Sequence, residues 1–517
     1  MPWGFYVIGE EEEVEAISVE DMRAYELNGV SLGIPLLLMM ENAGRSVADY
    51  IEYRLGGVRG KRIAVIAGKG GNAGDGFVAA RHLAGRGARV QVHLAYPPSE
   101  VAHEDAKLNL EALLGMDSVR IVKPMARGWL EVDDSDVVVD ALLGTGVRGS
   151  LRSPIKEAVE AFNKAPGLRV SIDAPTGVDP DTGAAVDEAA RADATVTMHK
   201  VKRGLLKARL YTGELVVAYI GLTRDAEYYA GPGDVAARIP LRPRDSHKGV
   251  GGRVLVVAGS KYYVGAPLLT ALSAARTGVD LVYLASPREI AFTAASKCST
   301  VIPYPLRGET LSREDLEGIA SMMERVHAVA IGPGLGREEE TLEAAARIIE
   351  LAVEKRVPLV VDADGLKAVA ESDTSLAETV ILTPHRGEAR LLSGVDAAPL
   401  EQARSISRRL GATVLVKAPR DAACNARGLC RENRSGVAAM SVGGTGDVLT
   451  GVIAGIMAKR NSILGDPSPL NSAITGAYLV GRAGELAYGR LGESLTALDI
   501  VEVIPGLLRD PLQGQTS

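Results

Sequence analysis

The chain has 517 residues, of which 46% are hydrophobic and 24% charged, and its formal net charge is -7. This length favours two or three domains, and the composition is typical of a folded globular protein rather than a disordered one. No long block of basic residues is present and the longest apolar run, Ile34 to Met40, is short. We therefore expect neither nucleic acid nor a membrane as a partner.

The N-terminal region carries the acidic run Glu10 to Glu13 where a secretory signal would have a basic and then an apolar stretch. We therefore expect a cytoplasmic protein. Cys424 and Cys430 could bridge a hairpin, but free thiols are the favoured interpretation for a chain with so few cysteines.

Short β-branched runs alternate with helical segments rich in Ala and Leu from about residue 60 onward. This alternation predicts α/β architecture with parallel sheets covered by helices. The expected strands of the first half are Arg62 to Ala67, Arg89 to Leu94, Asp136 to Asp140, Leu168 to Ile172, Thr195 to Met198 and Leu215 to Ile220. Those of the second half are Arg253 to Ala258, Asp280 to Ala285, Ala328 to Ile331, Leu359 to Asp362, Val380 to Leu382 and Val414 to Lys417.

A stretch rich in Pro, Gly, Arg and Asp, from Gly221 to His247, shows no sustained period. Such a stretch is typical of a domain boundary. We expect a first domain over 1–225, a linker over 226–240 and a second domain over 241–517. Each half starts with a strand followed by a Gly-rich turn, so each should carry a site at the carboxyl ends of its strands.

The first informative segment is GKGGNAGDG, Gly68 to Gly76, between an expected strand and an expected helix. A Gly-rich turn in this position lets backbone amides close on a phosphate at a helix N-terminus. Gly68, Gly70 and Ala73 also fit the dinucleotide pattern GxGxxG/A, but the next strand ends in His93-Leu94-Ala95, without a carboxylate for a ribose. A hydride-transferring domain is therefore disfavoured.

Two later strand ends carry polar residues. VVVDALLGTGVRG puts Asp140 at the end of a strand before a second Gly-rich turn, and SIDAPTGVD puts Asp173 and Thr176 at another. Together with Asn72 these side chains offer only oxygen ligands, which suit a hard cation. Residues spaced in this way could equally cap helices or brace turns, and spacing alone leaves both interpretations open.

In this order the three segments resemble the NAD(P)HX epimerase family, whose pattern is GxGNNGGDG, VDALLGTG and SIDxPSG. The similarity spans about residues 15 to 225 and continues through MHKVKRGL, Met198 to Leu205. Gly71 and Ala73 differ from the family's Asn and Gly. In the same region, Lys200, Lys202 and Arg203 could bind phosphates or form a basic surface.

The resemblance implies a Rossmann-like domain with a potassium ion held by Asn72, Asp140 and Thr176. It also implies that Asp173 binds the substrate, and a carboxylate there is a suitable acid or base for inverting the hydroxyl-bearing carbon. The further substrate-binding residues that it implies are Gly71, Asn72, Ala73, Gly74, Asp75, Gly144, Thr145, Gly146, Val147, Arg148, Gly149 and Ser150.

The strongest signal in the second half is SVGGTGDVLTGVIAGIMAKR, Ser441 to Arg460. Gly443, Gly444 and Gly446 precede a helix, and Asp447 falls on its first turn. Backbone amides there can stabilise a transferring phosphoryl group, and Asp447 can take a proton from the attacking hydroxyl. An N-cap would explain Asp447 alone but does not require the flanking glycines.

GxGD before a helix resembles the ribokinase-like fold, and five further segments narrow the resemblance to the NAD(P)HX dehydratase family over about residues 240 to 505. These segments are HKGVGGRVLVVAGS (His247 to Ser260), YVGAPLLTALSAARTGVDLV (Tyr263 to Val282), IGPGLG (Ile331 to Gly336), VVDADGL (Val360 to Leu366) and LTPHRGEARLL (Leu382 to Leu392). The expected fold is thus two three-layer α/β domains, Rossmann-like and then ribokinase-like.

The dehydratase resemblance implies that Ala266, Gly334, His385 and Asp447 bind the hydrated nucleotide. The residues that it implies around ADP are Lys417, Ala418, Pro419, Arg420 and Asp421, followed by Val437, Ala438, Ala439, Met440, Ser441, Val442, Gly443, Gly444, Thr445 and Gly446. The family usually has KGxxD where this chain has KAPRD, and Pro419 lacks a backbone donor.

The expected function is repair of hydrated NADH and NADPH. The first domain interconverts the R and S epimers of the hydrate, and the second phosphorylates the ring hydroxyl from ADP and releases phosphate. The expected cofactors are K⁺ in the first site and Mg²⁺ in the second. We expect small-molecule substrates, NADHX or NADPHX and ADP, and a homo-oligomer. The alternative is a vitamin-precursor kinase fused to a non-catalytic nucleotide-binding module.

Overall fold

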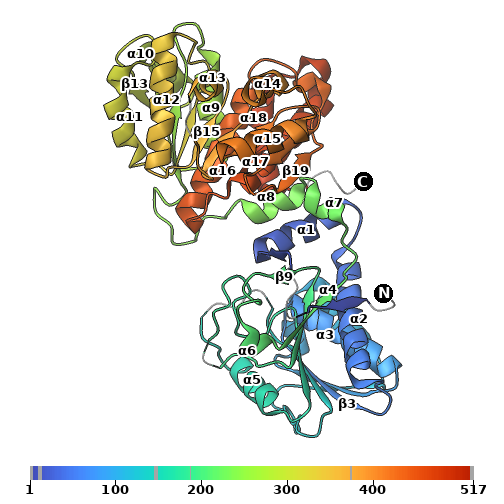
Figure 1. Cartoon of the computed structure of the whole chain (residues 1–517). Coiled ribbons are helices and arrows are strands. Elements are labelled where there is room, and N and C mark those ends of the chain that lie inside the picture. Colours follow the sequence, from blue (N-terminus) through green and yellow to red (C-terminus); the bar gives the residue numbers. More distant parts are fainter. Residues whose placement is uncertain (1–3, 10–13, 145–148, 187, 373–374, 513–517) are drawn as a thin grey trace. The chain divides into compact units, whose positions relative to one another are not determined.

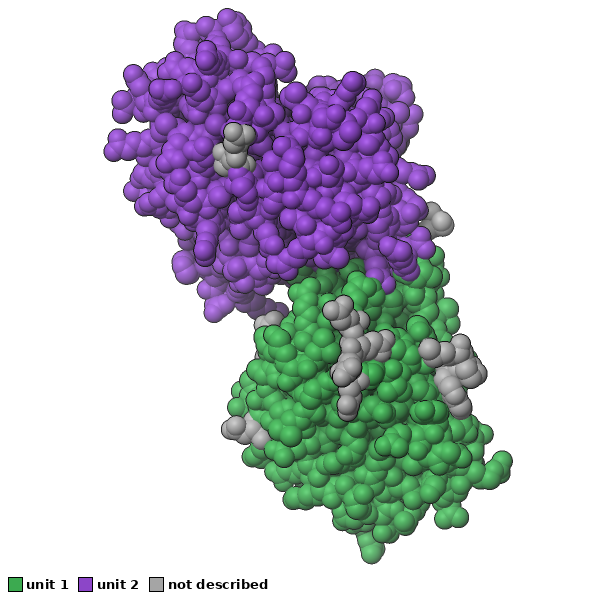
Figure 2. Space-filling model, viewed as in Figure 1, with its two compact units in different colours: residues 1–223 green, residues 224–517 purple. Residues whose placement is uncertain are grey.

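A computed structural model describes residues 4–9, 14–144, 149–186, 188–372 and 375–512. The chain divides into two compact units, Met1–Thr223 (unit 1) and Arg224–Ser517 (unit 2), which are coloured separately in Figure 2. Each unit contains a parallel sheet with helices on both faces, so the predicted α/β fold class is confirmed.

The main sheet of unit 1 has eight strands among the described residues, in the order β1-β10-β8-β7-β6-β3-β4-β5, and only β1 is antiparallel to its neighbour. A small second sheet pairs β2 with β9. The strands of unit 1 are β1 (Phe5–Val7), β2 (Ala16–Ile17), β3 (Arg62–Ala67), β4 (Arg89–Leu94), β5 (Val119–Val122), β6 (Val137–Ala141), β7 (Leu168–Ile172), β8 (Ala194–Met198), β9 (Val201–Lys202) and β10 (Glu214–Ala218).

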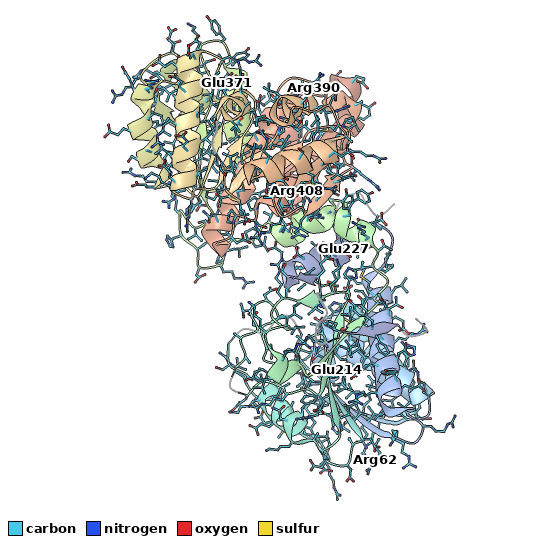
Figure 3. The ribbon with its side chains drawn as sticks, in the orientation of Figure 1. Arg62, Glu214, Glu227, Glu371, Arg390 and Arg408 are labelled. Carbon is cyan, nitrogen blue, oxygen red and sulfur yellow. A yellow bond between two sulfur atoms is a disulfide. The ribbon has the colours of Figure 1, made fainter. Side chains whose placement is uncertain are left out.

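Helices cover both faces of this sheet because its strands are apolar on both sides. On β3, Ile63 and Val65 belong to one core with α2 and α3, whereas Ala64 and Ile66 belong to another with α5. Glu214, labelled in Figure 3, accepts a hydrogen bond from the hydroxyl of Tyr50 in α2 at 2.6 Å. The helices are α1 (Val19–Ser31), α2 (Leu36–Leu55), α3 (Gly71–Gly85), η1 (Pro98–Glu100), α4 (Glu104–Leu114), α5 (Ile155–Lys164) and α6 (Arg209–Thr212).

The sheet of unit 2 has nine strands among the described residues, in the order β13-β12-β11-β14-β15-β16-β17-β18-β19, with antiparallel pairing only at β18 and β19. Its strands are β11 (Arg253–Val257), β12 (Leu281–Ser286), β13 (Val301–Pro305), β14 (Ala328–Ile331), β15 (Leu359–Val361), β16 (Val380–Leu382), β17 (Thr413–Val416), β18 (Asp421–Cys424) and β19 (Cys430–Asn433).

Alternate residues of β11 again face different cores. Val254 and Val256 pack with α9, α16 and α17, whereas Leu255 and Val257 pack with α11 and α12. These five helices are labelled in Figure 1. The helices of unit 2 are α7 (Arg224–Tyr228), α8 (Pro232–Arg238), α9 (Gly265–Arg276), α10 (Arg288–Lys297), η2 (Arg313–Asp315), α11 (Leu316–Met323), α12 (Glu339–Glu354), α13 (Asp364–Glu371), α14 (Arg386–Ser393), α15 (Pro399–Leu410), η3 (Ala438–Met440), α16 (Thr445–Leu464), α17 (Pro469–Leu491), η4 (Gly492–Ser494) and α18 (Ala497–Arg509). No helix in the described part of the chain is long and apolar enough to cross a membrane.

The segment predicted to be a linker, 226–240, instead contains most of α7 and all of α8, which belong to unit 2. Asp234, on the first turn of α8, is buried and accepts hydrogen bonds from Arg238 at 2.8 Å and from Arg431 of β19 at 2.9 Å. This buried network stabilises α8. The sequence did not predict the helix, because it is too short to give a periodic pattern and because Arg431 is distant in sequence.

The expectation of free thiols at Cys424 and Cys430 is wrong. These residues face each other across the antiparallel pair β18 and β19, with 4.1 Å between their Cα atoms, and they form a disulfide. The remaining cysteine, Cys298, is a free thiol.

In both sheets two strands that are not consecutive in sequence lie side by side near the middle, β3 with β6 and β11 with β14. Connections leave such a pair in opposite directions, which opens a crevice at the carboxyl ends of the strands. The loops at these two points carry the Gly-rich segments of the sequence.

Candidate active sites

Unit 1 contains a cavity of about 500 Å³ at the carboxyl ends of β3, β6 and β7. Its wall includes residues from all three strand ends and from α1, α2 and α3. The lining residues are Met22, Glu26, Leu36, Met39, Met40, Ala43, Lys69, Gly70, Gly71, Asn72, Asp75, Tyr96, His103, Leu142, Leu143, Gly144, Asp173, Met198, Lys202 and Ile220.

The first Gly-rich segment enters helix α3 at Gly71, so its second half is the first turns of the helix rather than a loop. A Cβ at Gly68 would lie 2.1 Å from the carbonyl oxygen of Leu142, so only glycine lets the β3 and β6 loops come this close. Gly71, Asn72 and Asp75 then line the cavity.

Not every predicted substrate residue lies at this cavity. Ala73 is buried in the core, and a Cβ at Gly74 would lie 2.5 Å from the sulfur of Met40, so both residues serve packing. Gly149 and Ser150 are exposed and do not line the cavity. Four predicted positions, Thr145, Gly146, Val147 and Arg148, lie outside the described residues.

Asp140 is the penultimate residue of β6 and is fully buried. It accepts hydrogen bonds from the Thr176 hydroxyl at 2.8 Å, the Thr176 amide at 2.9 Å and the Ser171 hydroxyl at 2.9 Å. Burial raises its pKa, which these bonds partly oppose. Among the described residues Asp140 has no cationic partner, and this is unusual for a buried carboxylate.

Asn72 and Thr176 each lie beside the turn after β6. The Thr176 hydroxyl lies 3.0 Å from the Leu143 amide and 3.1 Å from its carbonyl oxygen, and a Cβ on the next residue, Gly144, would lie 3.6 Å from the Asn72 side chain. Both polar atoms of that side chain are buried without a hydrogen-bond partner among the described residues. A buried amide is expected to have partners, so its environment suits an ion or a ligand.

Asp173 follows β7 with a φ of 62°, a conformation that non-glycine residues rarely adopt. Its Oδ1 atom lies 2.5 Å from Nζ of Lys202 and 3.3 Å from the Met198 amide. Lys202 is fully buried and also donates to the Thr197 hydroxyl and the Met198 carbonyl, both at 3.1 Å. It therefore holds the Asp173 carboxylate in place rather than lying on a basic surface.

Two other carboxyl groups line the same cavity. Burial, supported by the Asp173 charge, raises the pKa of Glu26 to about 7, while Lys202 and Arg23 oppose the shift. Burial and the charges of Asp173 and Glu26 raise the pKa of Asp75 well above its usual range. The sequence pattern did not single out Glu26, because it lies on a helix that carries no motif.

In unit 2 the Gly-rich turn leads into α16, and Asp447 lies on its first turn as predicted. Gly444 has a φ of 97°, and a Cβ there would lie 2.4 Å from Leu269 of α9. Both the backbone conformation and the close approach therefore require glycine at this position. The amides of the turn lie at the helix N-terminus, where an anion is favoured.

Asp447 lies close to a buried ion pair. Lys417 Nζ is 2.6 Å from Asp362 Oδ1, and the Thr450 hydroxyl donates to Asp362 Oδ2 at 2.8 Å. Burial and the Asp362 charge raise the pKa of Asp447 to about 7, and Lys417 opposes this shift. A carboxylate with this pKa can accept and release a proton near neutral pH.

The predicted substrate residues of unit 2 come from different elements, since Ala266 lies on α9, Gly334 follows β14 and His385 follows β16. A Cβ at Gly334 would lie 3.3 Å from Ala266, so these two are neighbours. His385, after β16, pairs in a bridge with Lys417 after β17. The Nδ1 atom of His385 accepts a hydrogen bond from the Glu388 amide at 3.1 Å, so His385 also caps α14. The His385 side chain is 60% exposed.

The KAPRD segment is stabilised internally. The amide of Ala418 donates to Asp421 at 3.0 Å, and Asn433 donates to the other oxygen of Asp421 at 3.0 Å. With Pro419 lacking an N–H, few backbone donors of this segment are available to a nucleotide. Nearer α16, the Thr445 hydroxyl donates to the Met440 carbonyl at 2.8 Å and fixes the loop before the helix.

No group of three or more His, Cys, Asp or Glu side chains among the described residues could hold a metal ion.

Comparison with known proteins gives matches over both units. The family described as YjeF-related protein N-terminus matches residues 37–204, and the family described as NAD(P)H-hydrate dehydratase matches residues 254–506. A bifunctional NAD(P)H-hydrate repair enzyme of Hyperthermus butylicus is 43% identical over 96% of this chain and 93% of its own length. A bifunctional NAD(P)H-hydrate repair enzyme of Pyrobaculum aerophilum is 41% identical over 96% of this chain and 98% of its own length. A crystal structure of an ADP/ATP-dependent NAD(P)H-hydrate dehydratase from Bacillus subtilis, co-crystallised with ATP and Mg²⁺, is 26% identical, with a TM-score of 0.45 over 53% of this chain and 95% of that one.

Proposed function

The chain belongs to the family of bifunctional NAD(P)H-hydrate repair enzymes, and we propose how its two sites divide the work. Unit 1 interconverts the R and S epimers of hydrated NADH and NADPH. Unit 2 dehydrates the S form to NAD(P)H at the expense of ADP, giving AMP and phosphate. The observation that carries this proposal is that each unit has its own polar site with a positioned aspartate, Asp173 in one and Asp447 in the other.

In unit 2, Asp447 takes the proton of the substrate's ring hydroxyl, whose oxygen then attacks the terminal phosphorus of ADP. The amides of the turn before α16 stabilise the charge on the transferring group. AMP leaves, and the phosphorylated intermediate loses phosphate together with a proton from the neighbouring ring carbon, which regenerates the dihydronicotinamide. The pKa of Asp447, about 7, supports its role as the base.

We place the hydrated nicotinamide near Ala266, Gly334 and His385, and the ADP along the turn before α16. Lys417 lies beside this turn, because a Cβ at Gly446 would be 3.3 Å from its Nζ. Its charge can therefore reach the phosphates although it is bound to Asp362. When bound with the nucleotide, Mg²⁺ neutralises charge on the phosphate oxygens.

In unit 1, we propose that Asp173 acts as an acid or base at the hydroxyl-bearing carbon of the substrate. This carbon is bonded to the ring nitrogen, whose lone pair supports loss of the hydroxyl. Lys202 forms an ion pair with Asp173 and fixes the orientation of its carboxylate, which suits the role of base. The apolar part of the cavity, including Met22, Met39 and Met40, can cover the ring and exclude bulk water.

The donor set beneath this cavity fits a monovalent cation. Asn72 supplies an amide oxygen that has no partner among the described residues, Asp140 a buried carboxylate without a cationic neighbour, and Thr176 a hydroxyl. A potassium ion held by these residues would compensate the buried charge and fix the turn after β6.

The decisive experiment supplies the purified protein with hydrated NADH, ADP and Mg²⁺ and measures recovery of NADH absorbance. Conversion of the whole mixture of epimers to NADH supports both activities. Conversion of only the S epimer would contradict the epimerase activity of unit 1. A stable phosphorylated product without NADH would instead support the small-molecule kinase alternative. A homo-oligomer and a cytoplasmic location stay predictions from the sequence.

A further inference from the structure

We infer that Glu26 is a second acid–base residue of the unit 1 site and acts as the partner of Asp173. This inference rests on the proposed epimerase function. Glu26 lies on α1, before the residues 37–204 that match the family model, yet it lines the same cavity as Asp173 and Lys202. Among the described residues its carboxylate forms neither a hydrogen bond nor an ion pair.

Helix α1 packs tightly against the rest of unit 1, and this packing fixes where Glu26 lies. A Cβ at Gly29, one turn from Glu26, would lie 2.4 Å from Leu222 and 2.8 Å from Met39. At the other end Ser18 and Asp21 form a capping box, and the Val19 amide donates to Asp181 at 2.8 Å. The packing of α1 therefore directs the Glu26 carboxylate into the cavity, although this carboxylate forms no hydrogen bond or ion pair with the described residues.

The charges around Glu26 come from several elements. Arg23 lies on its own helix, Lys202 on β9, Asp173 after β7 and Asp75 on α3. The other titratable groups of the cavity are Lys69, Tyr96 and His103. Three carboxyl groups therefore share the site with the Lys202 ammonium, which is bonded to Asp173. At neutral pH one of the other two carboxyl groups is then expected to carry a proton.

The inversion can be written with its atoms balanced. Protonated Glu26 gives its proton to the ring hydroxyl, the C–O bond breaks with its electron pair on oxygen, and water leaves as the nitrogen lone pair forms a C=N⁺ bond. Water then adds to the other face of that carbon, and Asp173 takes one of its protons. Exchange with solvent returns the proton to Glu26. The opposite epimer reacts by the same steps with the two roles reversed.

Glu26 suits the acid better than Asp75 does. Burial and the charges of Asp173 and Glu26 raise the pKa of Asp75 well above its usual range, so Asp75 holds its proton too firmly to give and regain it near neutral pH. It also belongs to the segment expected to hold the substrate. Glu26 has no such assignment, and it has a pKa of about 7, which allows it both to give and to regain a proton.

The test uses the full-length protein without ADP, so that dehydration is silent, and follows conversion of R to S by chromatography. We expect Glu26→Gln to lower the turnover number by ~10²-fold or more with little change in KM. In the plot of the epimerisation rate against pH, the variant should lack the change in rate that the wild type shows near pH 7. Dehydration of the S epimer with ADP should stay at the wild-type rate. Glu111→Gln, on the exposed face of α4, is the matched control.

Each remaining outcome overturns the inference. Wild-type epimerisation by Glu26→Gln removes the residue from the chemistry. A loss with an unchanged pH profile or a lowered Tm assigns it a structural role, and loss of the pH limb in Asp75→Asn but not in Glu26→Gln transfers the role to Asp75. Retention of the original oxygen in heavy-oxygen water excludes the water-loss route. Absence of epimerisation in both the wild type and Glu111→Gln would be a failure of the proposed function instead.

Discussion

Lys417 and Asp362 form a buried ion pair beside Gly446, with 2.6 Å between Nζ and Oδ1. The two residues follow different strands, β17 and β15, and their charges act on Asp447 with opposite signs. Asp362 raises the pKa of Asp447 and Lys417 lowers it. Burial raises the pKa of Asp447 most, and the two charges of the ion pair then adjust the proton affinity of this proposed base in opposite directions.

The first prediction concerns Asp447 itself. Asp447→Asn should lower dehydration of the S epimer by ~10²–10⁴-fold, because the ring hydroxyl loses its proton acceptor. Epimerisation should be unchanged, since it takes place in unit 1. Absorbance of NADH measures the first activity and chromatography of the epimers the second. Near wild-type dehydration by this variant would exclude Asp447 as the base.

The second prediction concerns the ion pair. Asp362→Asn removes the charge that raises the pKa of Asp447 and leaves Lys417, which lowers it. The pKa of Asp447 should therefore fall, its ionised form should persist to lower pH, and the acidic limb of the dehydration profile should move down. Thr450→Val is the control, because it removes the 2.8 Å hydrogen bond to Asp362 without changing a charge. A limb that stays in place or moves up would contradict this account.

The third prediction concerns potassium. Asn72→Ala should abolish the response of epimerisation to K⁺ while leaving the fold intact, because the side chain it removes has no hydrogen-bond partner among the described residues. Asp140→Ala should also weaken epimerisation, with a larger effect on stability, since Asp140 accepts bonds from Thr176 and Ser171. Rates are compared in K⁺ and in choline at equal ionic strength. A wild-type rate indifferent to the ion would argue against the site.

The strands that the sequence predicted best are the buried central ones. The predicted bounds of β3 and β14 agree with the structure, because runs such as RIAVIA are apolar on both faces. Short strands without such a run were missed, including β13, which contains two prolines, and the polar β19. The disulfide between Cys424 and Cys430 crosses the hairpin of β18 and β19, an arrangement that the sequence allowed but that its few cysteines made the less favoured interpretation.

Within the sites, the sequence identified residues that lie in motifs and missed those that only tertiary contacts bring there. Asp173 was predicted from its strand end, but its partner Lys202 looked like part of a basic surface. Lys202 is fully buried on β9, and the strand that pairs with β9 is β2, about 185 residues earlier in the chain. Glu26 had no sequence signal, since its importance depends on where α1 packs.

The last prediction concerns the phosphoryl donor, for which ADP should exceed ATP in kcat/KM by about tenfold or more, a difference of ~1.4 kcal/mol in activation free energy. The turn before α16 packs directly against α9 and α18, since a Cβ at Gly444 would lie 2.4 Å from Leu269 and 3.1 Å from Ala497. It cannot retreat to admit a longer nucleotide without disturbing α9 and α18. If the terminal phosphate of ADP contacts the turn amides, the additional phosphate of ATP must enter the space expected for the hydrated ring.

Each nucleotide is supplied separately, freed of the other, with Mg²⁺ and the S epimer, and the products are quantified. AMP and phosphate formed in equal amounts with NADH from ADP would support the assignment. Faster turnover with ATP, yielding ADP, would show that the third phosphate has room beside the substrate. The assigned donor would then be wrong, while the role of Asp447 as the base would stand, because it acts on the hydroxyl and not on the nucleotide.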